Sequence, residues 1–318
     1  MNILVTGAAG FVGSTLCEQL IARGDTVVAL DNMNDYYSPE RKQANIAPML
    51  DNPRFHFVQG DFRDRPLLES VFAGHPIDVV AHLGAMGSVR FSVKNPALYV
   101  DVNITGTANL LEFAWRAGVG RFVFASTSSV YGQTTEIPFV ETARTDGPLA
   151  MYPASKKSAE VMGHAYHNMH GMHFTGLRFF NVYGPKGRPD MMPWIVLESL
   201  LHDREITLFD GGDMRRDWTY VDDIVSGVVA AIDRPLGYSL MNIGRGEPIS
   251  MTEFIAIMEE LTGKKARIKV TPAPASEPKV TFANVDKARE LLGYNPQTPV
   301  REGLRRFVEW YTANQPKG

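Results

Sequence analysis

The chain has 318 residues, of which 44% are apolar and 21% are charged, and its formal net charge is −3. This is the composition of an ordinary globular protein, and so small a charge excludes the strongly basic surface typical of nucleic-acid-binding proteins. The single cysteine, Cys17, excludes an internal disulfide and lies in a helical pattern that predicts a buried, unreactive side chain. No apolar run reaches the roughly 18 residues of a membrane helix, and no leader peptide is expected before the first strand. We therefore expect a cytoplasmic protein that binds neither nucleic acid nor membrane.

Apolar runs rich in Val, Ile and Phe alternate along the chain with segments whose apolar residues have helical spacing. The runs predict buried strands at 2–6, 26–30, 54–58, 78–83, 121–126, 173–179 and 238–244. Helical spacing marks 14–24 and 97–118 among the segments between them. Alternation of this kind predicts an α/β protein with a doubly wound parallel sheet of the Rossmann type.

The pattern changes after the sixth predicted strand. Residues 184–193 are rich in Gly, Pro and charge, and residues 270–280 are rich in Pro. We expect residues 1–183, joined by 221–244, to form a nucleotide-binding domain. Residues 184–220 and 245–318 are expected to form a smaller C-terminal lobe that binds the substrate.

A glycine-rich turn follows the first predicted strand and opens the first predicted helix. Gly7 permits the tight turn, Gly10 lets the backbone approach a pyrophosphate, and Gly13 lets the helix pack on the strand. Asp31 ends the second strand, where a carboxylate accepts hydrogen bonds from the adenosine ribose and repels a 2′-phosphate, which favours NAD over NADP. The alternative is a glycine turn without a ligand. Asp61, after the third strand, reaches the adenine amino group or serves as a helix N-cap.

Tyr152 and Lys156 are spaced four residues apart and would share one face of a helix. Pro153 is tolerated only in a first helical turn, which places Tyr152 at the helix N-terminus, where the dipole favours a phenolate. A neighbouring ammonium would lower the phenol's pKa further, so Tyr152 is a candidate general base. The alternative is a surface helix that carries a stacked pair.

Taken together, these segments resemble the extended short-chain dehydrogenases/reductases of the sugar-nucleotide epimerase and dehydratase branch. The resemblance covers nearly the full length and rests on TGAAGFVG, GDFRD, AHLGAMGSVRFS, DVNITGT, STSSVYG, YPASK, LRFFNVYGP and RRDWTYVDD. It implies a tightly held NAD, catalytic roles for Tyr152 and Lys156, and a nucleotide sugar clamped by the smaller lobe. The other residues that it implies at the cofactor are Phe11, Val12, Asn32, Phe62, Leu83, Ala85 and Asn103. No metal site is expected.

The turn STSSVYG, residues 126–132, contains hydroxyl groups but no Asp or Glu. Relatives that dehydrate carry an acidic pair at this turn, and relatives that decarboxylate carry a Glu. Hydroxyls are poor acids and bases near neutral pH, so a ketone formed at C4 of the sugar is expected to take its hydride back. Return to the opposite face is 4-epimerisation. Thr127 or Ser128 is assigned to proton relay, and Ser128 and Ser129 to the sugar oxygen; the alternative is a hydrogen-bonded strand end.

The segments DNMNDYYSP and RFFNVYGPKGRPDM resemble UDP-glucuronate 4-epimerases, whose arginine in GRPDM binds the sugar carboxylate. By position this arginine is Arg188, and a planar guanidinium matches a carboxylate with two hydrogen bonds. The carboxylate must be held because a 4-keto glucuronate is a β-keto acid that loses carbon dioxide. Arg90 and Lys186 are further cations expected near the pocket, and the alternative for each is a solvated surface charge.

The chain departs from this pattern at several positions. Asn181 stands where glucuronate epimerases have Thr and neutral-sugar epimerases have Asn, and AHLGAMGSV replaces the usual AHLAAQAGV. In PAPASEPKV, Glu277 stands in for an Asp that contacts the nucleotide in relatives, and no Arg is evident. Arg216 fits the diphosphate-binding arginine, with Arg215 as the competing choice.

The leading hypothesis is an NAD-dependent UDP-glucuronate 4-epimerase, and the alternative within the family acts on UDP-glucose or a UDP-N-acetylhexosamine. A non-catalytic NAD-binding protein and a dehydrogenase that releases NADH are alternatives of other classes. The resemblance also implies a homodimer that pairs helices around 97–116 and 152–170, although packing against the sheet explains their apolar residues equally well.

Overall fold

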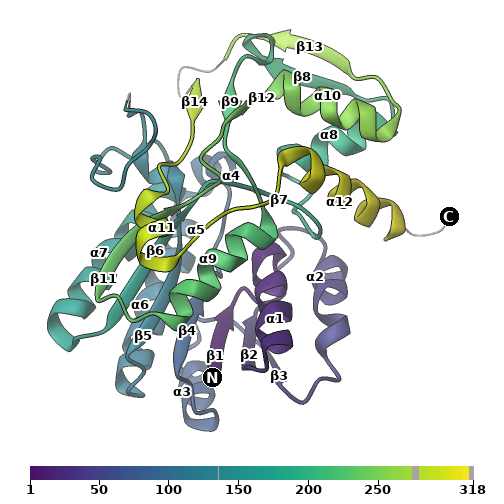
Figure 1. The fold of residues 1–318 in the computed structure, drawn as a ribbon. Helices are drawn as coiled ribbons and strands as arrows, with labels where there is room; N and C mark the ends of the chain where they lie inside the picture. Colours follow the sequence, from purple (N-terminus) through teal and green to yellow (C-terminus); the bar gives the residue numbers. More distant parts are fainter. Residues whose placement is uncertain (135, 274–278, 315–318) are drawn as a thin grey trace.

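A computed structural model describes residues 1–134, 136–273 and 279–314 and contains a seven-stranded parallel sheet (Figure 1). All seven predicted strands are confirmed within a residue or two at each end. They are β1 (Asn2–Thr6), β2 (Thr26–Asp31), β3 (Phe55–Gln59), β4 (Val79–His82), β5 (Arg121–Thr127), β6 (His173–Phe179) and β11 (Tyr238–Ile243). Their order is β11-β6-β5-β4-β1-β2-β3, and every pairing is parallel. The predicted Rossmann-type fold class is confirmed.

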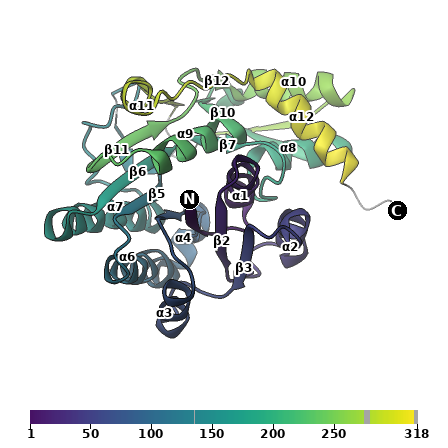
Figure 2. The same cartoon turned by 60° about the horizontal axis from the view of Figure 1, so that its bottom comes forward.

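Helices cover both faces of the sheet, as the continuous apolar strands require. On one face lie α1 (Phe11–Arg23) and α9 (Val221–Asp233), which contact each other, with α2 (Pro39–Ile46) beside α1. On the other lie α3 (Arg65–Gly74), α6 (Gly106–Arg116) and α7 (Met151–His170) (Figure 2). The two layers have separate cores: Ile3 and Val5 face the α1 side, whereas Leu4 between them faces the other. Cys17 is fully buried in the α1 layer, as predicted.

The predicted helix over 97–118 is helical from residue 96 to residue 116, but it is not α-helical throughout. It consists of α5 (Pro96–Tyr99), a π-helical turn at Val100–Thr105 and α6, and it is preceded by α4 (Val89–Lys94). Single π-helical turns are rare and are frequent at functional sites. This one lies beside the start of α7, the helix that carries the Tyr-x-x-x-Lys pair.

Most of the remaining elements lie beyond the carboxyl ends of the sheet strands (Figure 1). The strands pair as β7 (Asn181–Tyr183) with β10 (Trp218–Tyr220), and as β8 (Glu205–Phe209) with β13 (Arg267–Thr271). A third small sheet has the order β12 (Ile249–Ser250), β9 (Arg215–Arg216), β14 (Val280–Thr281). The helices are α8 (Met192–Leu201), α10 (Met251–Thr262), α11 (Asp286–Leu292) and α12 (Val300–Ala313). Of these, α11 packs against α9 and β11 of the main sheet.

The strand order reverses at β1, which lies between β2 and β4. In open parallel sheets the crevice at such a reversal, beyond the carboxyl ends of the strands, is the usual ligand site. The glycine-rich turn that follows β1 lies at this crevice. Within the described part of the chain, no helix is both long and apolar enough to cross a membrane.

Candidate active site

In the turn after β1, the backbone at Gly13 lies directly against the backbone at Gly7. Gly7 has φ +68°, a left-handed conformation that glycine adopts without strain. A Cβ on Gly13 would lie 2.0 Å from the carbonyl oxygen of Gly7, so only glycine lets α1 start this close to the turn. Gly10 is the N-cap of α1 and supplies no capping side chain. The N–H groups of the first turn of α1 are therefore available to a ligand phosphate.

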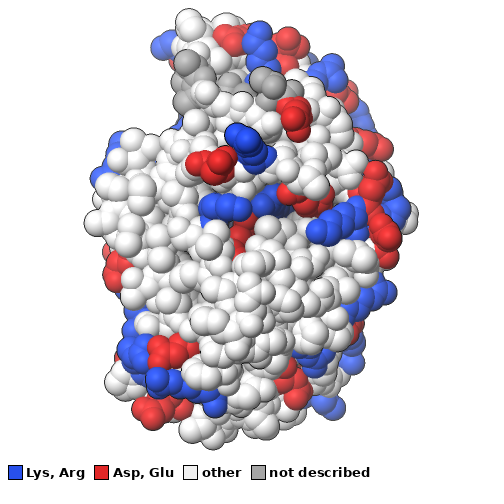
Figure 3. Space-filling view, turned by 90° about the vertical axis from the view of Figure 1, so that its left-hand side faces the viewer, with Lys and Arg blue, Asp and Glu red and all other residues white. Residues whose placement is uncertain are grey.

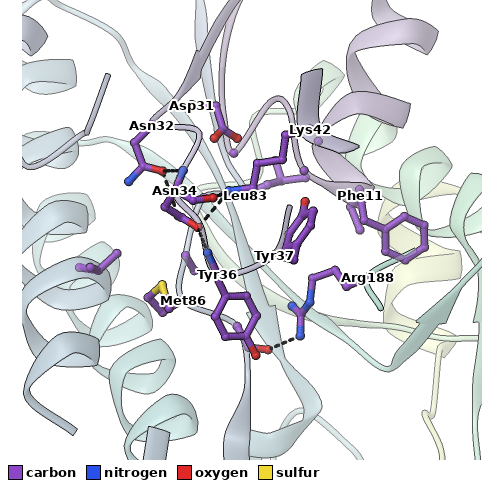
Figure 4. A pocket seen from close by; sticks show the side chains of 18 of the residues that line it. Phe11, Asp31, Asn32, Asn34, Tyr36, Tyr37, Lys42, Leu83, Met86 and Arg188 are labelled. Carbon is purple, nitrogen blue, oxygen red and sulfur yellow. Dashed lines mark hydrogen bonds between the residues drawn. The ribbon is translucent and has the colours of Figure 1, made fainter. Parts of the chain in front are cut away.

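A cavity opens at this turn and extends to the loop before α8 (Figure 4). Ten of the predicted cofactor residues line it: Gly7, Gly10, Phe11, Val12, Gly13, Asp31, Asn32, Phe62, Leu83 and Ala85. Its wall also contains Leu30, Asn34, Tyr36, Tyr37, Lys42, Gly84, Met86, Gly87, Val102 and the predicted substrate residue Arg188. One cavity thus joins the dinucleotide-type turn to the arginine expected at the sugar.

Asp31 lies at the carboxyl end of β2 and is buried. Its carboxylate accepts hydrogen bonds from the backbone N–H groups of Ala9, at 3.1 Å, and Met33, at 2.8 Å. These bonds fix the carboxylate at the edge of the cavity, where a ribose hydroxyl is expected to meet it.

Asp61 does not cap a helix, so that alternative is wrong. The N-cap of α3 is Asp64, whose side chain accepts from the backbone N–H of Leu67. Asp61 instead accepts from the Asn32 amide at 2.8 Å and from Arg63; burial raises its pKa, but these hydrogen bonds and the charge of Arg63 together lower it below the usual value. Asp61 is outside the cavity lining, and through Asn32 it fixes a residue that does line it.

Tyr37 and Lys42 are cavity residues that the sequence patterns did not assign. The hydroxyl of Tyr37 is buried and has no hydrogen-bond partner among the described residues. Buried hydroxyls nearly always have partners, so an unpaired one in a cavity wall points to a ligand atom that satisfies it. Lys42 donates to the backbone and side-chain oxygens of Asn34 and lies 5.0 Å above the Tyr37 ring. The glycine turn, Asp31 and this hydroxyl together fit an NAD molecule.

Helix α7 starts at Met151, so Tyr152 and Pro153 lie in its first turn, as the sequence predicted. Tyr152 is hydrogen-bonded to the side chain of Thr127, at the end of β5. One turn further along α7, Lys156 is 3% exposed, and its ammonium lies 4.7 Å from the centre of the Phe124 ring. The strand end and the helix start thus bring the predicted proton-transfer residues together.

The charges of this pair differ from the expectation. Burial raises the pKa of Tyr152, and the Thr127 hydrogen bond and the charge of Arg188 only partly offset it. Burial lowers the pKa of Lys156 to about 7. The cation that acts on Tyr152 in this structure is therefore Arg188, and Lys156 contributes no resolved shift. A phenolate at Tyr152 requires more positive charge than the described residues supply, and a nicotinamide cation is of the required sign.

Asn103, in the π-helical turn, connects the cavity to α7. Its side-chain oxygen accepts from the backbone N–H of Met86, and its amide donates to the carbonyl of Met86 at 3.0 Å and to the Ser155 hydroxyl at 2.9 Å. Ser155 in turn donates to the carbonyl of Tyr152. Asn103 is predicted at the cofactor but is not in the cavity lining. In this structure it fixes the start of α7 relative to the Met86 loop.

The hydroxyl turn follows directly from β5. Ser128 and Ser129 begin a 3-10 turn at Ser128–Tyr131, and Thr127 is its N-cap. The Thr127 hydroxyl lies 3.2 Å from the Ser129 hydroxyl and accepts from the Ser129 N–H. Ser128 is half-buried. Thr127 is therefore the member of this turn that contacts Tyr152.

The other predicted substrate residues lie outside the cavity lining. Arg90 is on the exposed side of α4, and Asn181 is half-buried on β7. Arg216 donates to the carbonyls of Arg215 and Lys279, whereas Arg215 is exposed. Glu277 is outside the described residues.

Lys186 lies in the loop that carries Arg188 but faces away from the cavity. Its ammonium pairs with Glu18 of α1 at 2.6 Å. Lys186 is not among the residues that line the cavity.

Comparison with known proteins agrees with this geometry. The model of the NAD dependent epimerase/dehydratase family matches residues 3–244. The chain belongs to this family. The predicted family and its nicotinamide cofactor are thereby confirmed. The match spans the parallel sheet, the cavity residues and the residues at the start of α7.

Several members of the epimerase family are similar over nearly the whole chain. UDP-glucuronate 4-epimerase of Thermodesulfobacterium geofontis is 41% identical, with 98% of this chain and 96% of that protein covered. UDP-glucuronate 4-epimerase 3 of Arabidopsis thaliana is 40% identical, with 98% and 76% covered. The crystal structure of UDP-glucuronic acid 4-epimerase from Bacillus cereus with UDP-glucuronic acid and NAD has a TM-score of 0.92 at 36% identity, with 98% and 99% covered.

Within this epimerase-family chain, the cavity residues that sequence reasoning missed come mainly from one segment. Asn34, Tyr36, Tyr37 and Lys42 all follow β2 in the stretch that begins DNMNDYY. That stretch carried part of the resemblance, but no residue in it after Asn32 had been given a role. Two adjacent tyrosines five and six residues after Asp31 were the signal available for finding them.

Proposed function

We propose that the protein is an NAD-dependent UDP-sugar 4-epimerase that converts UDP-glucuronate to UDP-galacturonate through a transient 4-keto sugar. Relatives of 39–41% identity that bear the name UDP-glucuronate 4-epimerase support the proposal. So does the resemblance to a structure that holds UDP-glucuronic acid together with NAD.

One observation carries the choice of substrate. Arg188 lies in the wall of the dinucleotide cavity, near enough to Tyr152 for its charge to lower the phenol's pKa. The turn that contacts Tyr152 offers only the hydroxyls of Thr127, Ser128 and Ser129. A guanidinium held by Asp190, close to a hydroxyl turn that has no acidic side chain, suits a sugar that brings its own carboxylate.

The chain's own residues hold NAD at one end of the cavity. The first turn of α1 would hold the pyrophosphate, Asp31 would accept from the adenosine ribose, and the Tyr37 hydroxyl would donate to an acceptor of the same molecule. When bound, NAD supplies the hydride acceptor and donor for C4 of the sugar.

Proton transfer is assigned to the residues at the start of α7. Tyr152 takes the proton of the C4 hydroxyl and later returns it, and Thr127 positions the sugar oxygen through its bond to Tyr152. Ser128 and Ser129 extend the hydroxyl surface beside it. Lys156, one turn further along α7, is assigned to binding the nicotinamide ribose.

Arg188 protects the intermediate. A 4-keto glucuronate loses carbon dioxide when the C–C bond to its carboxylate aligns with the ketone π system and the negative charge of the carboxylate moves toward the ketone. Charged hydrogen bonding from the guanidinium holds that charge and restricts rotation. Inversion then requires the ketosugar to turn over while its carboxylate remains bound or rebinds.

The test offers UDP-glucuronate, UDP-glucose and UDP-N-acetylglucosamine separately and resolves the galacto-epimer and the pentose of each reaction. We expect galacturonate from the acid and no pentose. Arg188→Ala should lower kcat/KM for the acid about a hundredfold or more, because a charged bidentate pair is lost. Arg289→Ala is the matched control, since Arg289 also pairs with an Asp but lies exposed on α11. Equal losses on acid and neutral sugars would remove Arg188 from this role.

A UDP-glucose or UDP-N-acetylhexosamine 4-epimerase is the second candidate. Asn181, where a glucuronate epimerase is expected to have Thr, favours it. The UDP-glucose 4-epimerase of Thermotoga maritima with UDP-glucose has a TM-score of 0.90 at 31% identity, with 98% of this chain and 99% of that chain covered. Turnover of the neutral sugars alone would establish this candidate.

We also propose that the enzyme is a cytoplasmic homodimer, and that residues 184–220 and 245–318 form the lobe that closes on the UDP-sugar. Exposed apolar side chains on the proposed dimer helices support the dimer: Val100, Trp115, Val161 and Met169. Figure 3 views the molecule from the side where α7 lies in Figure 1, and much of the middle of that face lacks charged side chains. Light scattering on the purified protein tests the dimer, and a monomer at micromolar concentration would exclude it.

A further inference from the structure

Arg188 is held by a carboxylate two residues further along its own loop. Its Nε donates to Oδ1 of Asp190 at 2.9 Å, and its Nη2 donates to Oδ2 at 2.9 Å. This side-on bidentate pair fixes the plane of the guanidinium. Nothing in the local sequence requires the pairing, because two charged residues with a proline between them can equally point apart.

Tyr36 contacts both members of this pair from a distant part of the chain. Its hydroxyl donates to Oδ2 of Asp190 at 2.9 Å, and its ring lies 5.7 Å from the guanidinium of Arg188. The tyrosine is itself braced, since its backbone N–H donates to Asn34 and its ring packs edge-on against Phe91 at 5.2 Å. The loop after β2 therefore supports the arginine of the loop before α8.

Gly87 completes the enclosure. Nη2 of Arg188 donates to the Gly87 carbonyl at 3.1 Å, and a Cβ on Gly87 would lie 2.7 Å from Nη1. Arg188 thus occupies the space that the Cβ of any other residue at position 87 would fill. Gly87 lies in AHLGAMGSV, the segment in which this chain departs from the usual pattern, so the departure and the arginine's position are spatially connected.

These contacts leave one edge of the guanidinium for a ligand. A guanidinium has five N–H groups, and the described contacts use those of Nε and Nη2. The N–H groups of Nη1 take part in none of the described hydrogen bonds, and Arg188, whose charge acts on Tyr152, lines the cavity. An arginine held in this way loses little side-chain freedom when a carboxylate binds.

We propose that Asp190, Tyr36 and Gly87 are positioning residues that preset Arg188 for a carboxylate-bearing sugar, and that they determine the preference for acidic over neutral UDP-sugars. They act through Arg188 and need not contact the substrate. The inference rests on the proposed function, because it assumes that Arg188 meets the sugar carboxylate.

The test uses the full-length, NAD-loaded protein and three single variants: Asp190→Asn, Tyr36→Phe and Gly87→Ala. Calorimetric titration gives the dissociation constants of UDP-glucuronate, UDP-glucose and UDP, and initial rates give KM and kcat for the acid. Asp286→Asn is the matched control, because Asp286 pairs with Arg289 in an exposed Asp–Arg pair away from the cavity.

Each of the three variants should weaken UDP-glucuronate binding about tenfold, as expected for the loss of one charged hydrogen bond or its geometry. Binding of UDP should change less than twofold, and the pentose should appear among the products. The KM for the acid should rise more than kcat falls. A merely structural role would weaken UDP and UDP-glucuronate equally.

Equal weakening of all three ligands would overturn the inference, and so would unchanged binding of the acid. Tighter binding of the acid by Asp190→Asn would overturn it too, because Asp190 would then be a competitor for Arg188 and not its support. These outcomes leave the proposed function intact if the parent protein epimerises UDP-glucuronate. If the parent neither turns over nor binds UDP-glucuronate, the proposed function and this inference both fail.

Discussion

Replacing Glu160 with alanine should destabilise the protein strongly. Glu160 lies on α7 one turn beyond Lys156, and its side chain is completely buried. Oε1 accepts from the Ser126 hydroxyl at 2.7 Å and from Nε of Arg178 at 2.9 Å, and Oε2 accepts from Nη2 of Arg178 at 2.9 Å. The pair therefore joins the strand that ends at Thr127 and its neighbour β6 to the helix that carries Tyr152.

The magnitude follows from what the change leaves behind. The Arg178 side chain is 1% exposed, so without Glu160 its guanidinium is a buried charge with no carboxylate partner. Breaking one side of such a pair costs about 3–5 kcal/mol. For a chain of this size that corresponds to a fall of about 4–8 °C in the unfolding midpoint.

Thermal and urea-induced unfolding measured by circular dichroism test this value. The double variant Glu160→Met with Arg178→Met should recover most of the loss, because two apolar side chains of similar volume leave no unpaired charge. Glu302→Ala, which removes an exposed ion-pairing carboxylate on α12, should leave the midpoint nearly unchanged. A loss for Glu160→Ala below about 1 kcal/mol, or a double variant less stable than the single one, would refute the reasoning.

Three further predictions concern the cofactor end of the site. Burial lowers the pKa of Lys156 from 10.5 to about 7, so between pH 7 and 10.5 the unfolded chain binds more protons than the folded one. Without added NAD, the free energy of unfolding should therefore rise with pH in this range, and Lys156→Met should flatten the rise. Urea titrations at several pH values measure this, and the same rise in parent and variant would contradict it. Asp31→Asn should weaken NAD binding about tenfold, as measured by calorimetry, and should reduce the ratio of the affinities for NAD and NADP. An unchanged ratio would show that Asp31 does not select the ribose. Gly13→Ala should abolish NAD binding in the same titration, because the new Cβ would collide with the Gly7 carbonyl. Gly74→Ala is the control and should bind NAD normally, because its Cβ would have no atom within 4 Å. Equal NAD affinities of the two variants would show that the turn can rearrange to fit a Cβ at position 13.

The sheet was predictable because its strands are buried on both faces and therefore appear in the sequence as continuous apolar runs. The glycine turn was predictable for a similar reason, since its chemistry is local. The helix over 97–118 was predicted, but its π-helical turn was not, because the apolar spacing continues through the turn while Asn103 bonds to Met86 and Ser155, partners from other segments. Asp61 was a plausible N-cap by sequence, but Asp64 lies at the geometric start of α3.

The charges of the site depended on packing that no local pattern records. The spacing of Tyr152 and Lys156 was visible, but the burial that lowers the pKa of Lys156 comes from the sheet and the loops around it. The support of Arg188 by Tyr36 joins residues 152 positions apart and appears only in three dimensions. The sequence therefore predicted which residues carry the chemistry better than it predicted the residues that hold them in place.

The central claim is that hydride leaves C4 of UDP-glucuronate and returns to the same carbon while Tyr152 handles the proton. Mass spectrometry of the product from UDP-glucuronate deuterated at C4 tests it most directly, with Tyr152→Phe in parallel. The account predicts UDP-galacturonate that retains the deuterium, and turnover at least about a thousandfold slower in the variant, within the range contributed by general acid–base catalysis. Product that has lost the deuterium, or a variant as fast as the parent, would contradict it.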